Sequence, residues 1–478
     1  MSVKALTEQI LRKISTNNRW QYRFMLHLFP LWLAVRGRYN FTNLSRWGEY
    51  GEDTYRQNFA RPFSWLEFNA ELASQQLGQH LAIAFDPCFV PKSGKHTAGI
   101  GYFYSGCAGR ELRGLEFLGI AAVDLADKAA LHLEAVQTVG LKEGESQLAF
   151  YARILCERKE ALLRLSKYVT ADAYFAREPF VDTLLGEGFQ LMTRLRKDAR
   201  LRYLYNGPRL KRRRGRPKTY DGRINPYALR EDHFTPCAQA EDGSWAAYQA
   251  TVNVQSWKRN AKVVIVHHLD DQGQVKSAKI YACTDTGMDG AEVLHAYQCR
   301  FQIEFLYRDG KQHAGLAHCQ ARSPQKLHFH INTALTAVSL AKAAYCLSAP
   351  PQERKAFSML ERQIWRLPIL IFTIALTRRE RLTRALRTER TISILTKLRL
   401  MRLLAQLISV LIPERLQLET SQTGSFRLHE ELSNRVVLRA MILCHRRSTL
   451  RVVPLRDLPT CILTRWFYTS IPNLQQMV

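Results

Sequence analysis

The chain has 478 residues, enough for two to four domains with separate cores, and a hydrophobic share of 46% excludes a wholly disordered protein. Lys and Arg outnumber Asp and Glu by 69 to 42, so the formal net charge is +27. This excess favours a polyanionic partner, of which nucleic acid is the commonest and a membrane surface the alternative. The apolar runs are too short, or too often interrupted by Arg, to span a bilayer, so we expect no membrane association.

The cysteines and the first residues point to an intracellular protein. The opening segment is amphipathic and lacks a continuous apolar core, so we expect no secretory signal. Ten cysteines occur without a Cys-x-x-Cys pair, a usage typical of reduced thiols in the cytosol.

Residues 1–75 are expected to be helical, because apolar positions from Leu6 to Ile14 keep a helical period. Further on, Asn43 is a candidate cap of a short helix, and Gly51 separates that helix from a second one. Two short helices of this kind resemble a helix-turn-helix. The region is therefore a DNA-binding region or a helical hairpin without DNA contact, and both interpretations stay open.

Residues 76–200 change to an alternation of strands and helices. An apolar run predicts a first strand that ends at Asp86, and two more strands follow around the turn at 126–128. A helix, a fourth strand ending at Asp172, a helix and a fifth strand complete the segment. Both aspartates thus stand at predicted strand ends, where the active sites of α/β sheets gather. Asp also caps turns after strands, which is the structural alternative for each.

Residues 201–285 interrupt this pattern. They begin with a basic loop in which Arg214 and Arg216 form an Arg-Gly-Arg-Pro sequence, similar to the part of an AT-hook that enters the minor groove. A solvated basic loop that touches phosphates without selectivity is equally open. An alternating strand, an apolar strand and, after a turn, a third strand then predict a β-meander, and residues 286–350 return to helical character.

The helix after this insertion carries polar residues along one side. At about 100° per residue, four of them fall within a stripe of about 60° on a single helix. They are Tyr297, Arg300, Glu304 and Lys311. A carboxylate flanked by two cations and a phenol suits a phosphodiester bound with metal ions. A solvated face with an Arg300–Glu304 ion pair is the alternative, but it leaves the other two residues unexplained.

Three acids suit two-metal chemistry on nucleic acid. Asp86, Asp172 and Glu304 would converge on one edge of the sheet and clamp two Mg²⁺ ions about 4 Å apart. Mg²⁺ prefers oxygen ligands and keeps several waters, so a few carboxylates suffice. Asp285, just before the helix, is the reserve for Asp172 and a candidate cap.

The order Asp, Asp, β-rich insertion and Tyr-x2-Arg-x3-Glu-x6-Lys resembles the DDE transposases of bacterial insertion sequences, in the subgroup named for its YREK motif. The stretch "KSGKHTAG", with Lys92 and Lys95, is similar to one common after the first aspartate in that family. Phe301 stands where Trp is frequent, and "ADAYF" around Asp172 is a looser match. The resemblance covers roughly residues 20–355.

This resemblance implies an α/β protein with an RNase H-like catalytic core, divided into residues 76–200 and 286–350 by the β-rich insertion, with helical regions at both ends. Asp86, Asp172 and Glu304 would be both catalytic and metal-binding, with Mg²⁺ as cofactor and Mn²⁺ as a substitute. The enzyme would cleave the ends of its element and join the freed 3′-hydroxyls to target DNA. The implied DNA-binding residues are Tyr297, Arg300, Lys311, Lys92, Lys95, Arg214 and Arg216.

The implied partner is double-stranded DNA, at the transposon ends and at the target. A homodimer on those ends and a location in the bacterial cytoplasm, at the nucleoid, follow from the same resemblance. Two alternatives stay open: a catalytically inactive DNA-binding repressor of the element, and an RNase H-type DNA nuclease.

Residues 351–478 form a basic tail, either helical or divergent from the family. From Leu360 onward Arg far outnumbers Lys and no clear period persists. This change fits a tail read in a shifted frame, as in a degraded copy, or a divergent dimerisation region.

Overall fold

The computed structural model describes residues 2–14, 18–35, 37–106, 108–207, 218–348 and 357–359. All of them belong to the first of two compact units, Met1–Ile392, and the second unit is Ser393–Val478. Arg214, Arg216 and residues 360–478 therefore lie outside the described residues, and so do the predictions made for them.

Five helices occupy the N-terminal region: α1 (Val3–Leu11), α2 (Arg19–Trp32), α3 (Phe41–Trp47), α4 (Glu52–Asn58) and α5 (Trp65–Gln76). Asn40 caps α3 by accepting a hydrogen bond from the backbone N–H of Asn43 at 2.8 Å, so the cap is Asn40 and the predicted Asn43 is wrong. The extended backbone of Asn40 is what places its side chain over the first free N–H groups of the helix. Gly51 stands at the N-terminus of α4, as a separator of the two helices.

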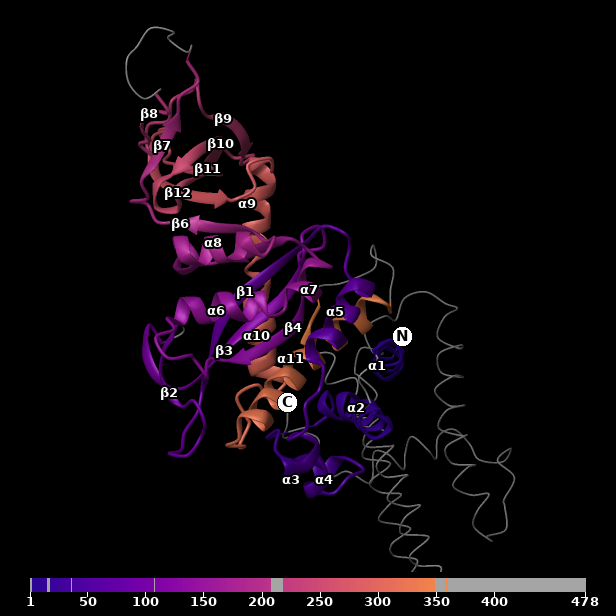
Figure 1. Ribbon diagram of the computed structural model, residues 1–478. Helices are drawn as coiled ribbons and strands as arrows, with labels where there is room; N and C mark the ends of the chain where they lie inside the picture. The colour runs from indigo at the N-terminus through magenta and orange to yellow at the C-terminus, as the bar shows by residue number, and fades with distance from the viewer. Residues whose placement is uncertain are drawn as a thin grey trace, which may run out of the picture. The chain divides into compact units, whose positions relative to one another are not determined.

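Twelve strands form one mixed sheet in the described part of the chain, which confirms the α/β class. The strands of its first half are β1 (Leu81–Pro91), β2 (Gly101–Ser105), β3 (Arg110–Asp124), β4 (Ala129–Gln137), β5 (Tyr168–Ala171) and β6 (Gln190–Leu195). Those of the second half are β7 (Leu201–Leu204), β8 (Tyr220–Arg223), β9 (Thr235–Gln239), β10 (Trp245–Val254), β11 (Arg259–Leu269) and β12 (Val275–Cys283). The order is β2-β3-β1-β5-β6-β12-β11-β10-β7-β8, with β4 also paired to β3 and β9 to β10 (Figure 1).

Only the centre of the described sheet is parallel. β5 runs parallel to β1 and to β6, while β3 is antiparallel to β1 and β12 is antiparallel to β6. The second half thus continues the same sheet across β6. β2, which the sequence analysis missed, pairs with the first residues of β3, and β4 pairs with the rest of that long strand.

The remaining helices cover the sheet. They are α6 (Gln147–Cys156), α7 (Lys159–Leu163), α8 (Glu178–Gly186), α9 (Gly290–Cys299), α10 (Gln302–His313) and α11 (Pro324–Cys346), with short 3₁₀ turns η1 (Ala173–Phe175) and η2 (Gln255–Trp257). The first residues of β1, from Leu81 to Phe85, are apolar because both faces of the strand are covered. Ala82 and Ala84 belong to the core shared with α9–α11, whereas Ile83 and Phe85 belong to the core shared with α6–α8.

Polar side chains attach α11 to the outer strand β4. The Asn332 amide accepts from the Ala135 N–H at 2.8 Å and donates to the Ala135 carbonyl at 2.9 Å. Its oxygen also lies 2.9 Å from His132 Nε2, and Ser339 accepts from the His132 N–H at 2.8 Å. These bonds pair backbone groups of β4 that no strand covers, which closes this edge of the sheet. None of the described helices is both long and apolar enough to cross a bilayer.

Candidate active site

Asp86 lies in the middle of β1, so the prediction that the strand ends there is wrong. β1 continues because β3 pairs with it along its whole length, from Leu81 to Pro91. Its pairing with β5, however, stops at Ala84. Asp86 therefore occupies the point where the two parallel strands separate, the place in an α/β sheet where side chains from both meet.

Asp172 follows directly after β5 and caps the turn η1, where its Oδ1 accepts from the Ala173 N–H at 2.6 Å. The Thr193 hydroxyl of β6 donates to the Asp172 carbonyl at 3.0 Å. Asp172 therefore caps a turn after a strand, as the structural alternative predicted, and this role does not remove it from the site. The Tyr297 hydroxyl lies 3.5 Å from the same Oδ1.

The predicted single helix is two helices, which corrects the one-stripe prediction. α9 ends at Cys299 and α10 begins at Gln302. Between them, the Glu304 N–H bonds to the Phe301 carbonyl at 3.0 Å, an i→i−3 pattern of a tight 3₁₀ turn. The reason is packing: α9 rests on strands β10–β12, whereas α10 rests on β1, β4 and α11.

Arg300, at this junction, connects two of the acids. Its Nη1 lies 3.4 Å from Asp86 Oδ1 and its Nη2 lies 3.0 Å from Glu304 Oε1. The guanidinium side chain is only 12% exposed. Burial by itself would lower the pKa of Arg300, but Asp86, Tyr297 and Glu304 outweigh it and raise that pKa. Arg300 is thus a fixed cation between the two carboxylates.

The carboxyl of Asp86 is affected first by burial and then by its charged neighbours. Burial, and then the nearby Glu304 and Asp172, raise its pKa to about 7, although Arg300 opposes the shift. Burial also raises the pKa of Tyr297 to about 12, with Asp172 adding to the shift. The structure therefore brings Asp86, Asp172, Glu304, Tyr297 and Arg300 into one interacting group.

The predicted lysines differ in their surroundings. Lys311 lies beside Cys88, two residues beyond Asp86, and partly offsets the burial that raises the pKa of the Cys88 thiol to about 11. Lys92 donates to the carbonyls of Cys319 and Ala321, the latter at 3.1 Å, so its ammonium ties together two loops of the protein itself. Lys95 is exposed.

Asp285, the reserve acid, lies away from this group. Its carboxylate binds the Lys167 ammonium at 3.1 Å and the Tyr168 hydroxyl at 3.0 Å, at the beginning of β5, whereas Asp172 follows the end of that strand. The cap of α9 is Asp289, which accepts from the Ala291 N–H at 2.8 Å, so the prediction that Asp285 caps it is wrong.

Two residues that the sequence analysis missed, Tyr307 and Gly119, contact the backbone of Asp86. The Tyr307 hydroxyl donates to the Asp86 carbonyl at 2.7 Å, and Gly119 pairs with Asp86 across β1 and β3. Gly119 interrupts an apolar strand, and a glycine inside a strand often marks the close approach of another group. That signal was available in the sequence.

The donor set fits a divalent cation. Among the described residues no three or more His, Cys, Asp or Glu side chains stand in the geometry of a metal site. Yet three carboxylates interact here and Arg300 bridges only two of them, while the pKa of the buried Asp86 is raised. Carboxylate oxygens are the donors that Mg²⁺ prefers, so these three acids are the residues that would hold such a cation.

The described residues thus form an α/β protein in which Asp86, Asp172 and Glu304 interact electrostatically. Residues 152–340 match the family described as a transposase DDE domain, a segment that includes Asp172 and Glu304, while Asp86 precedes it. This match supports a DDE transposase, a class that acts on DNA. A search of curated proteins found no match.

Proposed function

We propose that this protein is a Mg²⁺-dependent DDE transposase of the YREK subgroup, which cleaves the ends of its element and joins them to target DNA. The observation that carries the proposal is the contact of one guanidinium, from Arg300, with both Asp86 and Glu304 beside Asp172. Three acids from β1, β5 and α10, far apart in the chain, interact there with the Tyr and Arg of the predicted motif.

An RNase H-like core is part of this proposal. The order β4-β3-β1-β5-β6, with β3 antiparallel and β1, β5 and β6 parallel, supports that fold. The core would comprise residues 76–200 and 286–350, with β7–β12 as the main part of an insertion at 201–285. The N-terminal residues 1–75 would add a helical DNA-binding region.

Each residue of the group has a role that follows from its position. Asp86, Asp172 and Glu304 would hold two Mg²⁺ ions, which activate the attacking oxygen and stabilise the leaving oxygen of a phosphodiester. Arg300 offsets part of the charge of Asp86 and Glu304, and its planar guanidinium would also suit two oxygens of a phosphate. Lys311, on α10, lies beside Cys88 of β1 and would add a second positive charge there. Tyr297, beside Asp172, would contact the same strand of DNA.

Cleavage of DNA that carries the sequences flanking the gene tests this function. In Mg²⁺, we expect the wild-type protein to nick this DNA, and Glu304→Gln to lower the rate by at least about 100-fold while DNA binding persists. Glu292→Gln, an exposed Glu on α9, is the matched control and should cleave like the wild type.

Cleavage by Glu304→Gln at the wild-type rate would overturn the catalytic assignment. Binding without cleavage by the wild type would instead indicate the inactive DNA-binding repressor. Sedimentation of the complex with end DNA would test the proposed homodimer.

A further inference from the structure

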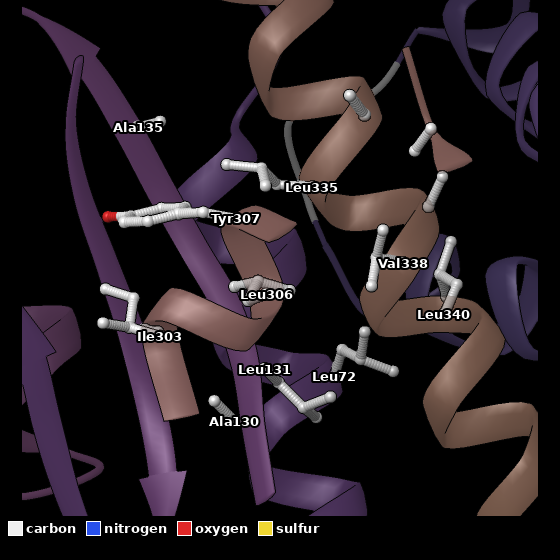
Figure 2. Packing of buried hydrophobic residues seen from close by; sticks show 14 of the residues in the cluster. Leu72, Ala130, Leu131, Ala135, Ile303, Leu306, Tyr307, Leu335, Val338 and Leu340 are labelled. Atoms are coloured by element: carbon white, nitrogen blue, oxygen red, sulfur yellow. The ribbon is translucent and has the colours of Figure 1, made fainter. Parts of the chain in front are cut away.

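Tyr307 connects the helix that carries one acid to the strand that carries another. It lies three residues after Glu304 on α10, hence on nearly the same side of that helix. The side chain is buried, and Figure 2 shows its ring pointing from α10 toward the strands, with Leu306 and Leu335 nearby. The hydroxyl at the far end of the ring donates to the Asp86 carbonyl at 2.7 Å.

Gly119 provides the space for this bond. It pairs with Asp86 in the register of β1 and β3, so side chains at the two positions would share one face of the sheet. A Cβ at Gly119 would collide with the Tyr307 hydroxyl and lie 2.8 Å and 2.9 Å from the ring atoms Cζ and Cε1. The φ of Gly119 is not in the left-handed region, so space and not backbone conformation requires glycine here.

A tyrosine at this buried position would destabilise the fold if its hydroxyl had no hydrogen-bond partner. Tyr307 lines a small pocket together with apolar side chains, among them Phe117, Leu316 and Leu335, and a phenylalanine would fill the same space. Burying a hydroxyl without a partner costs free energy. The Asp86 carbonyl supplies that partner at the residue whose side chain belongs to the acidic group.

We propose that Tyr307 is a positioning residue, whose hydroxyl, seated over Gly119, sets the offset of α10 along β1 and thereby the separation of the Glu304 and Asp86 carboxylates. The inference rests on the proposed function, since it concerns the same acids. Arg300 connects the same two acids through their side chains, whose oxygens a bound cation would also contact. The bond of Tyr307 involves only the backbone of Asp86, so it persists with and without a cation.

Tyr307→Phe in the full chain tests the inference, because it removes only the hydroxyl. We expect the affinity for Mn²⁺, measured by electron paramagnetic resonance without DNA, to fall several-fold. At saturating DNA, the single-turnover cleavage rate should fall about tenfold, with little change in the Kd for DNA. The Mg²⁺ concentration for half-maximal rate should rise in parallel.

Tyr55→Phe is the matched control, since it also removes the hydroxyl of a buried tyrosine, one that lies 2.7 Å from His27 Nε2 among the N-terminal helices. Thermal unfolding of both variants separates a general loss of stability from a change at the site. If Tyr307→Phe does not fold, Gly119→Ala carries the test, because its methyl group displaces the hydroxyl from Asp86; the same losses are expected.

The outcomes distinguish the two proposals. If the wild type cleaves DNA and Tyr307→Phe matches it in rate and in metal dependence, the positioning role is wrong and the transposase proposal stands. If the wild type does not cleave, the transposase proposal fails, and Mn²⁺ binding still decides the inference. Equal Mn²⁺ affinities of wild type and variant would overturn it.

Discussion

Arg300 is the cation that contacts two of the three acids of the site. Its guanidinium contacts Asp86 and Glu304 and is almost wholly buried, so it balances charge that the surrounding protein cannot solvate. A cation that binds these acids competes with Arg300 for the same oxygens. The residue therefore affects the stability of the metal-free protein and its affinity for metal in opposite directions.

Arg300→Gln tests whether Arg300 stabilises the metal-free protein and weakens its affinity for metal. Without divalent cations, we expect the free energy of unfolding to fall by about 1–3 kcal/mol, because two carboxylates lose their counter-ion. Addition of Mg²⁺ should then raise the melting temperature more than it does in the wild type. Arg308→Gln is the control, since Arg308 is 54% exposed in its pair with Asp309. An equal effect of Mg²⁺ on all three proteins would contradict the expectation.

At the scale of elements, the loop after β1 is fastened to the loop after α10. Lys92 donates to two carbonyls of the second loop, and the Ala98 N–H donates to the Arg322 carbonyl at 3.3 Å. Thr97, between them, is buried. These bonds join the segment that follows Asp86 to the segment that follows Glu304, so the two lysines of this loop should act differently.

Lys92→Met should destabilise the protein by about 1–3 kcal/mol, because two carbonyls lose a charged donor in a half-buried place. Lys95→Met should leave the stability unchanged, since Lys95 is exposed, and should weaken DNA binding if it contacts phosphate. Urea unfolding and a DNA-binding titration of both variants check this pair. Equal stabilities would show that the Lys92 bonds do not hold the loops together.

The motif residues belong to two separate helices, α9 and α10, which meet at Arg300. Tyr297 belongs to the helix on the second half of the sheet, and Glu304 belongs to the helix on β1. The junction at Arg300 lets each helix follow its own surface. Polar residues of the motif therefore meet the acids of β1 and β5 from two directions.

At the scale of the whole molecule, buried histidines make stability depend on pH. Burial lowers the pKa of His132 and of His330 to about 4; Glu134 and His328 face the first, and Lys92 faces the second. Between about pH 4 and pH 6.5 these two histidines bind protons in the unfolded chain but not in the folded chain, so their contribution to stability rises with pH across this window. Above it, these two residues contribute no further change.

We therefore expect each histidine to lower the free energy of unfolding at pH 5, relative to pH 7.5, by about 2 kcal/mol, whereas Asp86, whose pKa is raised to about 7, keeps its proton in the folded chain and acts in the opposite direction. Glu134, whose pKa is lowered to about 2 by His328 and Arg158 against the effect of burial, adds a loss only at more acidic pH. Urea unfolding at both pH values measures the difference, and His330→Gln should change it by about 2 kcal/mol relative to the wild type. A variant with the wild-type difference would exclude His330 as a source.

The net charge of +27 leads to a prediction about binding. If the protein neutralises 6–10 phosphates, its affinity for DNA should fall by about 10³–10⁵-fold between 50 and 200 mM salt. A fluorescence titration against salt measures the slope. A shallow slope, together with binding to anionic lipid vesicles, would point to a membrane surface as the polyanion.

The sequence by itself determined the α/β class and the candidate acids. Hydrophobic periodicity depends on residues close together in the chain, and the motif residues lie within one short segment. The strands of the β-meander and the turn after β5 were predictable for the same reason. The tertiary structure alone decided that β1 continues past Asp86, that the motif helix is two helices, and that Lys92 binds the protein's own carbonyls. Each of these depends on a partner far away in the chain. β1 continues because β3 pairs with it, and α9 and α10 are separate because they pack on different strands. Lys92 donates to carbonyls of the loop at 319–321. The bond of Tyr307 across Gly119 to Asp86 is of this kind as well, since it joins residues more than 200 positions apart.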